Sequence, residues 1–97
     1  MEQREKILQL LSKFYQQYAR EYRLKKMGLF GSMARGEARA DSDVDVVVEF
    51  ETPNLIRQAD LMLKLKELFQ REVDVVALWK HMNPRLQRRI EQDVIYV

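Results

Sequence analysis

Hydrophobic positions recur along this chain with two different periods, three to four residues in some segments and two in others. Between residues 2 and 22, apolar residues recur every three or four positions, and no glycine or proline interrupts them. This spacing predicts an amphipathic helix with one wide apolar face. That face is expected to carry Ile7, Leu8, Leu11, Phe14, Tyr15, Tyr18 and Tyr22.

Three shorter segments have the β-branched and apolar content that is typical of strands. They cover residues 24–30, 43–50 and 72–78. In the second of these strands, alternation predicts two faces of different character. One face is expected to carry Val44, Val46, Val48 and Phe50, and the other Asp43, Asp45, Val47 and Glu49.

The rest of the chain predicts two further helices and an edge strand. The longer helix is expected to begin at Pro53 or Asn54 and to end near Gln70. A short helix is expected over 84–93 and a small edge strand over 95–97. Strands that alternate with helices favour a sheet covered by helices over a helical bundle. The inner side of the longer helix is expected to carry Leu55, Ala59, Met62, Leu65 and Phe69.

Composition narrows the class of protein. A chain of 97 residues, 46% hydrophobic and 33% charged, is expected to form one soluble folded domain over residues 1–97. Lys and Arg exceed Asp and Glu by 17 to 15, so the net charge of +2 does not by itself indicate a nucleic-acid-binding protein. There is no cysteine, and His81 is the only histidine. These counts exclude disulfide scaffolds, thiol nucleophiles and Cys/His metal sites, so any metal must bind oxygen ligands.

The sequence also bears on location. Its uncharged apolar runs are only a few residues long, so we expect no membrane span. The first residues are of mixed charge and lack the apolar core of a secretion signal, so we expect a protein of the reducing cytoplasm.

Two of the predicted strands contain aspartate, a residue type that is uncommon in strands. Asp43 and Asp45 are two positions apart in the most valine-rich segment, and Asp74 lies inside another valine-rich strand. Same-face positions in a strand are roughly 7 Å apart, so neighbouring strands can bring three carboxylates to one face. Such carboxylates repel one another unless a cation such as Mg²⁺ lies between them. The alternative is that Asp43, Asp45 and Glu49 form only the solvent-exposed face of a half-covered strand.

The segment before these acids has the character of a phosphate-binding turn. Residues 31–42 are small and polar and are expected to form a loop with one helical turn. Gly31 follows an apolar strand and permits close approach of the backbone to a phosphate, and Ser32 adds a hydroxyl donor. Gly31 alone is compatible with an ordinary turn. A Gly-Ser turn that is followed, after ten intervening residues, by the paired acids Asp43 and Asp45 is a much more specific pattern.

This arrangement resembles the DNA-polymerase-β-like nucleotidyltransferase superfamily. Residues 31–48 read GSMARGEARADSDVDVVV, which is similar to the minimal nucleotidyltransferase (MNT) branch, where Gly-Ser-x-Ala-Arg-Gly leads into Ser-Asp-x-Asp. The resemblance implies an α+β nucleotidyltransferase fold of the α/β sandwich type. Its small mixed β-sheet of three to four strands would be covered by helices.

The resemblance also implies a role for each matching residue. Asp43 and Asp45 would hold two Mg²⁺ ions, and Asp74 would hold one of them and help to deprotonate the attacking hydroxyl. Two cations can stabilise the attacking and leaving oxygens of an in-line displacement on phosphorus. The remaining matches are nucleotide-binding candidates: Gly31 and Ser32 for the β- and γ-phosphates, Arg35 for a phosphate or for bracing the loop, and Ser42 for a cap or a nucleotide contact.

MNT domains resemble the antitoxin half of two-gene modules whose partner is a HEPN-domain ribonuclease toxin. The implied activity is transfer of AMP from ATP to a tyrosine of that toxin. The shortness of the chain leads us to expect that another macromolecule presents the acceptor. Two alternatives stay open: a non-catalytic antitoxin that occludes its partner, and a nucleotidyltransferase that acts on RNA or a small molecule.

Other motifs are weaker. Residues 41–45 resemble the start of an EF-hand, but Val46 and Thr52 stand where that loop needs Gly and Glu. No Walker A sequence is present, and a Ser–His–Asp triad would depend on His81 alone. Two groups of basic residues are either solvated faces or surfaces that attract RNA or an acidic protein. They are Arg20, Arg23, Lys25 and Lys26, and then Arg85, Arg88 and Arg89. Trp79, Tyr15, Tyr18 and Tyr22 are expected to pack.

Overall fold

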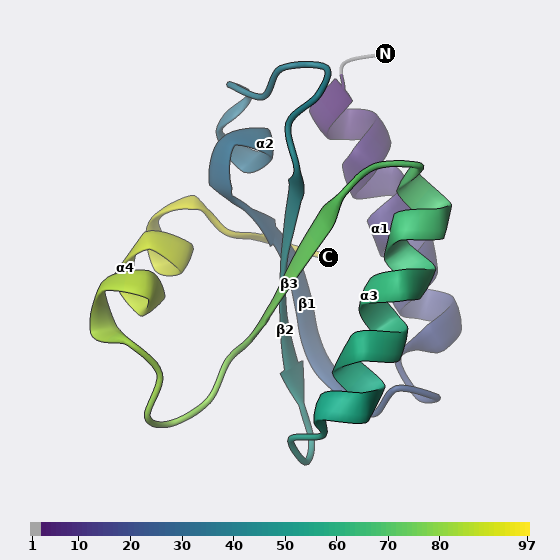
Figure 1. Ribbon diagram of the computed structural model, residues 1–97, viewed down its shortest axis with the longest axis vertical. Helices are drawn as coiled ribbons and strands as arrows, with labels where there is room; N and C mark the ends of the chain where they lie inside the picture. The colour runs from purple at the N-terminus through teal and green to yellow at the C-terminus, as the bar shows by residue number, and fades with distance from the viewer. Residues whose placement is uncertain (1–2) are drawn as a thin grey trace.

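The computed structural model describes residues 3–97, and within them four helices and four strands follow one another along the chain (Figure 1). The predicted order of elements is confirmed, and the expected single helical turn is a short helix at the end of the first strand. The elements are α1 (Gln3–Tyr18), β1 (Leu24–Phe30), α2 (Gly31–Arg35), β2 (Val44–Phe50), α3 (Leu55–Phe69), β3 (Val73–Ala77), α4 (Pro84–Asp93) and β4 (Ile95–Tyr96).

The strands form one mixed sheet in the order β3-β2-β1-β4. β1 is antiparallel to both β2 and β4, whereas β2 and β3 are parallel. The parallel pair is possible because α3 carries the chain back between them. In the resulting register Asp45 lies opposite Phe30 on one side and opposite Asp74 on the other. The mixed sheet expected from the resemblance is therefore confirmed.

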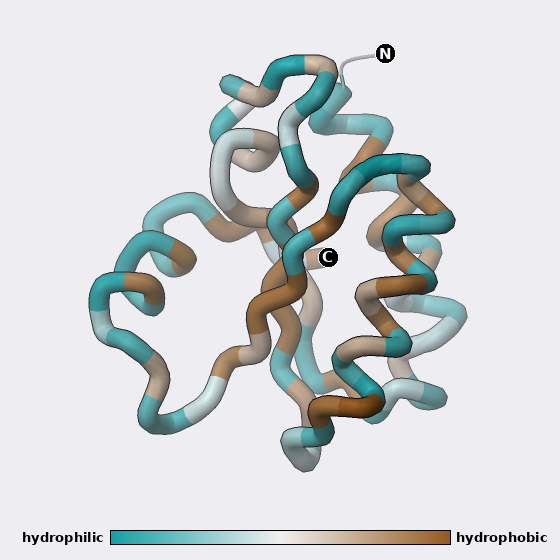
Figure 2. The backbone as a smooth tube through the Cα atoms, in the orientation of Figure 1, coloured by the Kyte–Doolittle hydropathy of each residue, from teal (hydrophilic) through white to brown (hydrophobic). Residues whose placement is uncertain are grey.

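Helices α1 and α3 cover one face of the sheet, and α4 lies on the other (Figure 1). The predicted alternation in β2 explains this division, because Val46 and Val48 pack in the large core beneath α1 and α3. Val47 points the other way, into a smaller cluster with Phe30 and Ile90. Figure 2 shows hydrophobic residues along the strands between these layers and mostly hydrophilic residues along α4. Asp45 and Asp74 thus belong to the face that α4 covers only in part.

The first helix is shorter than its apolar pattern predicted. It ends at Tyr18, and a turn over residues 19–23 leads into β1. Tyr22 is nevertheless buried, and its hydroxyl donates a hydrogen bond to Asp60 of α3 at 2.7 Å. Position 2 lies outside the described residues. The tyrosine therefore joins the core from a turn, although the spacing placed it on the helix.

The prediction of which side of α3 is buried is wrong for the first half of the helix. Leu55 is 83% exposed and Ala59 is also exposed, whereas Leu61, which the pattern left out, is fully buried. Ala59 and Leu61 are two residues apart and so about 200° apart around a helix. Apolar residues occur on both sides of α3, so spacing alone permitted two faces. The buried stripe is Leu61, Leu65 and Phe69.

Within residues 3–97, every helix is too short or too polar to cross a lipid bilayer. Trp79, which was expected to pack, is 55% exposed. Its ring lies edge-on to the ring of His81, with the two ring centroids 5.6 Å apart.

Candidate active site

Asp45 and Asp74 occupy directly opposed positions on the parallel strands β2 and β3. Neighbouring strands are about 4.8 Å apart, and opposed residues point to the same face, so the two carboxylates share the α4 side of the sheet. Asp43 stands just before β2, two residues from Asp45, and is exposed. The fold thus brings all three predicted acids to the end of the sheet where β1 runs into α2.

The environment of Asp45 makes its charge unfavourable. Asp45 is half-buried, and this burial is the main cause that raises its pKa. The negative charges of Asp74 and then Asp43 raise the pKa further, whereas Arg89 and Arg35 lower it. A carboxylate in this position gains more from a bound cation than an ordinary surface carboxylate does.

The donor set of this cluster suits a hard cation such as Mg²⁺, because all three groups are carboxylates that can also leave room for phosphate oxygens and water. Among residues 3–97, no three His, Cys, Asp or Glu side chains are gathered closely enough to form a metal site without rearrangement. Metal binding by Asp43, Asp45 and Asp74 therefore stays a prediction.

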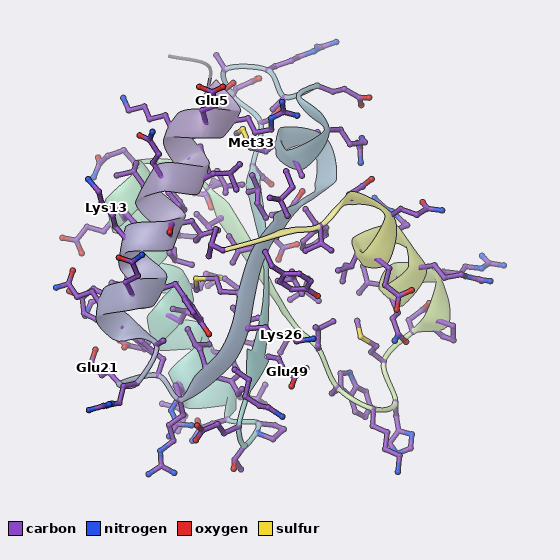
Figure 3. All side chains as sticks on the ribbon, turned by 180° about the vertical axis from the view of Figure 1, so that it is seen from behind. Glu5, Lys13, Glu21, Lys26, Met33 and Glu49 are labelled. Atoms are coloured by element: carbon purple, nitrogen blue, oxygen red, sulfur yellow. The ribbon has the colours of Figure 1, made fainter. Side chains whose placement is uncertain are left out.

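Gly31 turns the chain directly beside the acids. Its φ is +75°, a conformation that favours glycine, and a Cβ at this position would lie 2.3 Å from Oδ2 of Asp45. Ser32 follows at the start of α2, and its hydroxyl has no hydrogen-bond partner within residues 3–97. Buried Met33, labelled in Figure 3 beside α1, anchors α2 in the core. The predicted phosphate-binding turn and the acids thus lie next to each other.

The two remaining predicted residues serve the local structure. The Arg35 guanidinium donates to Glu37 at 3.0 Å and to Asp93 of α4 at 2.6 Å, and these hydrogen bonds raise its pKa. Arg35 therefore braces α2 against α4. The Ser42 hydroxyl accepts a hydrogen bond from the Arg39 amide at 2.8 Å, so Ser42 caps its own turn. Contact of either side chain with nucleotide stays a prediction.

Two residues near the site were not recognised from the sequence as part of it. Arg71 precedes β3 and donates hydrogen bonds from Nη2 to the backbone carbonyls of Ser42 and Arg39, the latter at 3.1 Å. It holds the loop that carries Asp43, and nothing in the pattern around Arg71 indicates this. Arg89 lies on α4 near enough to influence Asp45. The sequence did place Arg89 in a basic group, but not beside the acids.

Comparison with known proteins agrees with this geometry. The family model described as "Polymerase beta, Nucleotidyltransferase" matches residues 6–97. The chain is 32% identical over 94 residues to "Protein adenylyltransferase MntA" of Thermococcus cleftensis, covering 96% of this chain and 94% of that protein.

Solved structures show the same fold. One, assigned provisionally as a minimal nucleotidyltransferase, has a TM-score of 0.70 and 34% identity, covering 95% of this chain and 89% of that chain. Another is described as a tri-AMPylated HEPN toxin of Shewanella oneidensis in complex with an MNT antitoxin. It has a TM-score of 0.63 and 25% identity, covering 99% of this chain and 71% of that one. The chain belongs to the polymerase-β nucleotidyltransferase family and has the fold of its minimal nucleotidyltransferases.

Proposed function

We propose that this protein transfers AMP from ATP to a hydroxyl, most simply that of a tyrosine, on a HEPN-type ribonuclease toxin and thereby acts as its antitoxin. The observation that carries the proposal is the in-register pair Asp45 and Asp74 beside the Gly31 turn. Similarity to a named protein adenylyltransferase and to an MNT antitoxin in complex with an AMPylated toxin supports the choice of substrate. We place the reaction in the cytoplasm, the compartment that supplies ATP.

The proposed reaction is a displacement at the α-phosphorus of ATP. Asp74 accepts the proton of the acceptor hydroxyl, whose oxygen forms a bond to the α-phosphorus. The bond between that phosphorus and the bridging oxygen to the β-phosphate breaks, and pyrophosphate leaves with the electron pair. Gly31 and Ser32 hold the β- and γ-phosphates through the backbone and the hydroxyl. The chain's own task is thus to orient the reacting atoms and to remove one proton.

Asp43, Asp45 and Asp74 are the residues that would hold Mg²⁺. When bound there, Mg²⁺ would supply positive charge to the phosphate oxygens. The raised pKa of Asp45 supports this assignment, because desolvation and like charge favour a cation at the same point.

A second candidate is neutralisation by occlusion without catalysis. The observation that favours it is the pair of exposed apolar side chains Leu55 and Trp79, which line one hollow of the surface, because exposed apolar patches mark surfaces that bind other proteins. The two functions are not exclusive, since an enzyme that modifies a protein must also bind it.

Labelling of the purified toxin with α-phosphate-labelled ATP and Mg²⁺ tests the proposal. We expect wild type to label the toxin and Asp43→Asn/Asp45→Asn to lose labelling while still binding it. Glu49→Gln is the matched control, because Glu49 lies on the same face of β2 and pairs with Lys25 at 3.2 Å. If the double variant still protects cells from the toxin, occlusion accounts for neutralisation.

A further inference from the structure

The C-terminal half of α4 is fixed beside Asp45. Ile90, 1% exposed, packs in one cluster with Phe30 and Val47. Phe30 is the cross-strand neighbour of Asp45, and Val47 is the next residue of β2 on the same face. The residue that precedes Ile90 in α4, Arg89, is therefore held near the acids by the packing of its neighbour.

The direction of Arg89 follows from the helical repeat. Residues four apart lie on one side of a helix, so Arg85, Arg89 and Asp93 form a single stripe along α4. The last member of that stripe contacts Arg35 of α2 at 2.6 Å, so the stripe faces α2. Arg89 is one turn before Asp93 and is thus directed toward the space between α2 and β2. In agreement, its charge lowers the pKa of Asp45 more than the charge of Arg35 does.

Arg89 and Arg35 differ in how their charge is used. Arg35 pairs with both Glu37 and Asp93, whereas Arg89 is exposed and makes no ion pair or hydrogen bond within residues 3–97. A guanidinium that faces an acidic site and keeps its donors free is suited to bind an anion in two-point geometry.

We propose that Arg89 is a further catalytic residue, which binds the β- and γ-phosphates of ATP and stabilises the pyrophosphate that leaves. The inference rests on the proposed function for the identity of the nucleotide. When the bond between the α-phosphorus and the bridging oxygen breaks, the electron pair stays on pyrophosphate and its negative charge grows. A fixed guanidinium on the leaving-group side stabilises this charge. Asp43, Asp45 and Asp74 are themselves negative and bind cations, so they cannot stabilise the negative charge of pyrophosphate directly.

The competing interpretation is that the basic side of α4 attracts an acidic macromolecule without regard to position. Arg88 provides the matched control, because it is exposed, adjacent and of equal charge but lies about 100° around the helix from Arg89. Calorimetric titration with ATP, pyrophosphate and AMP in the presence of Mg²⁺ compares Arg89→Gln with Arg88→Gln. We expect Arg89→Gln to bind ATP and pyrophosphate roughly tenfold more weakly and AMP unchanged, whereas Arg88→Gln binds all three as wild type.

Equal losses in both variants, or no loss in Arg89→Gln, would overturn the proposal. An equal loss for AMP would also overturn it, because AMP lacks the phosphates in question. Arg89→Lys keeps the charge but not the planar fork, so it should recover only part of the pyrophosphate affinity. These titrations need no protein acceptor. If wild type fails to label a toxin but Arg89 still governs pyrophosphate binding, the proposed acceptor is wrong and the assignment of Arg89 to the β- and γ-phosphates stands.

Discussion

The α-carbon of Gly31 and the carboxylate of Asp45 are so close that no side chain fits between them. A Cβ at position 31 would lie 2.3 Å from Oδ2 of Asp45, which is well inside van der Waals contact. The glycine of the turn and the acid of the strand are therefore one structural unit. Their distance in sequence, fourteen positions, conceals this until β1 and β2 pair.

This contact predicts the effect of Gly31→Ala. The variant must strain a φ of +75° and also displace Asp45, so we expect at least a tenfold loss of AMP transfer. Gly36→Ala is a close control, because Gly36 has the same φ of +75° but its Cβ would meet only Arg4, at 3.4 Å. Gly36→Ala should lose about 1 kcal/mol of stability and keep most activity. Equal loss of activity in the two variants would show that backbone strain alone is responsible.

The raised pKa of Asp45 predicts a cost in stability. A carboxyl whose pKa is higher in the folded than in the unfolded state favours folding below its unfolded pKa, and this contribution is lost as pH rises through the folded pKa. Without Mg²⁺ at pH 7, Asp45→Asn should therefore melt at a higher temperature than wild type. The difference should close as pH falls and the carboxyl becomes protonated. A lower melting temperature for Asp45→Asn at pH 7 would contradict this electrostatic description.

Binding of Mg²⁺ with ATP should reverse this order of melting temperatures, so that wild type melts above the variant that lacks the carboxylates. A ligand that binds only the native state stabilises it, by about 2.7 kcal/mol at one hundred times its Kd. We expect Mg²⁺ with ATP to raise the melting temperature of wild type, and to have little effect on Asp43→Asn/Asp45→Asn. A thermal shift of equal size in both proteins would place the metal–nucleotide complex elsewhere on the chain.

Arg71 should influence catalysis through the loop that it holds. Its guanidinium binds the Ser42 and Arg39 carbonyls, and Asp43 follows directly in the chain. Arg71→Gln should lower kcat about three- to tenfold, with a small change in KM for ATP and about 1 kcal/mol of lost stability. It should also speed proteolysis within residues 36–43. Arg20→Gln, at an exposed position in the turn after α1, is the control and should change none of these quantities.

Much of the site could be read from the sequence because its signals are local. Asp45 and Asp74 interrupt valine-rich strands, which is unusual by itself. Gly31 alone fits an ordinary turn, and it becomes informative through its place shortly before the paired acids. That Asp45 and Asp74 are directly opposed depends on the parallel register of β2 and β3. Periodicity reveals the face of a strand but not its register with another strand.

The parts that the sequence did not reveal depend on tertiary packing. Leu55 continues an apolar helical pattern yet is exposed, because the sheet meets α3 along the stripe that contains Leu61. Arg71 acts through backbone carbonyls, which leave no mark on the sequence of the loop they belong to. Arg89 is directed at the site only because Ile90 fixes α4 against β1 and β2. In each case the deciding partner lies far along the chain.

The central claim, AMP transfer to a partner toxin at the Asp45 site, is tested most directly by the intact mass of the toxin that co-purifies with this protein. With wild type or Glu49→Gln we expect the toxin to carry the added mass of one or more adenylate units. With Asp43→Asn/Asp45→Asn we expect the complex to form and the toxin to have its unmodified mass. An unmodified toxin in the wild-type complex, or the same added mass with the double variant, would contradict the account.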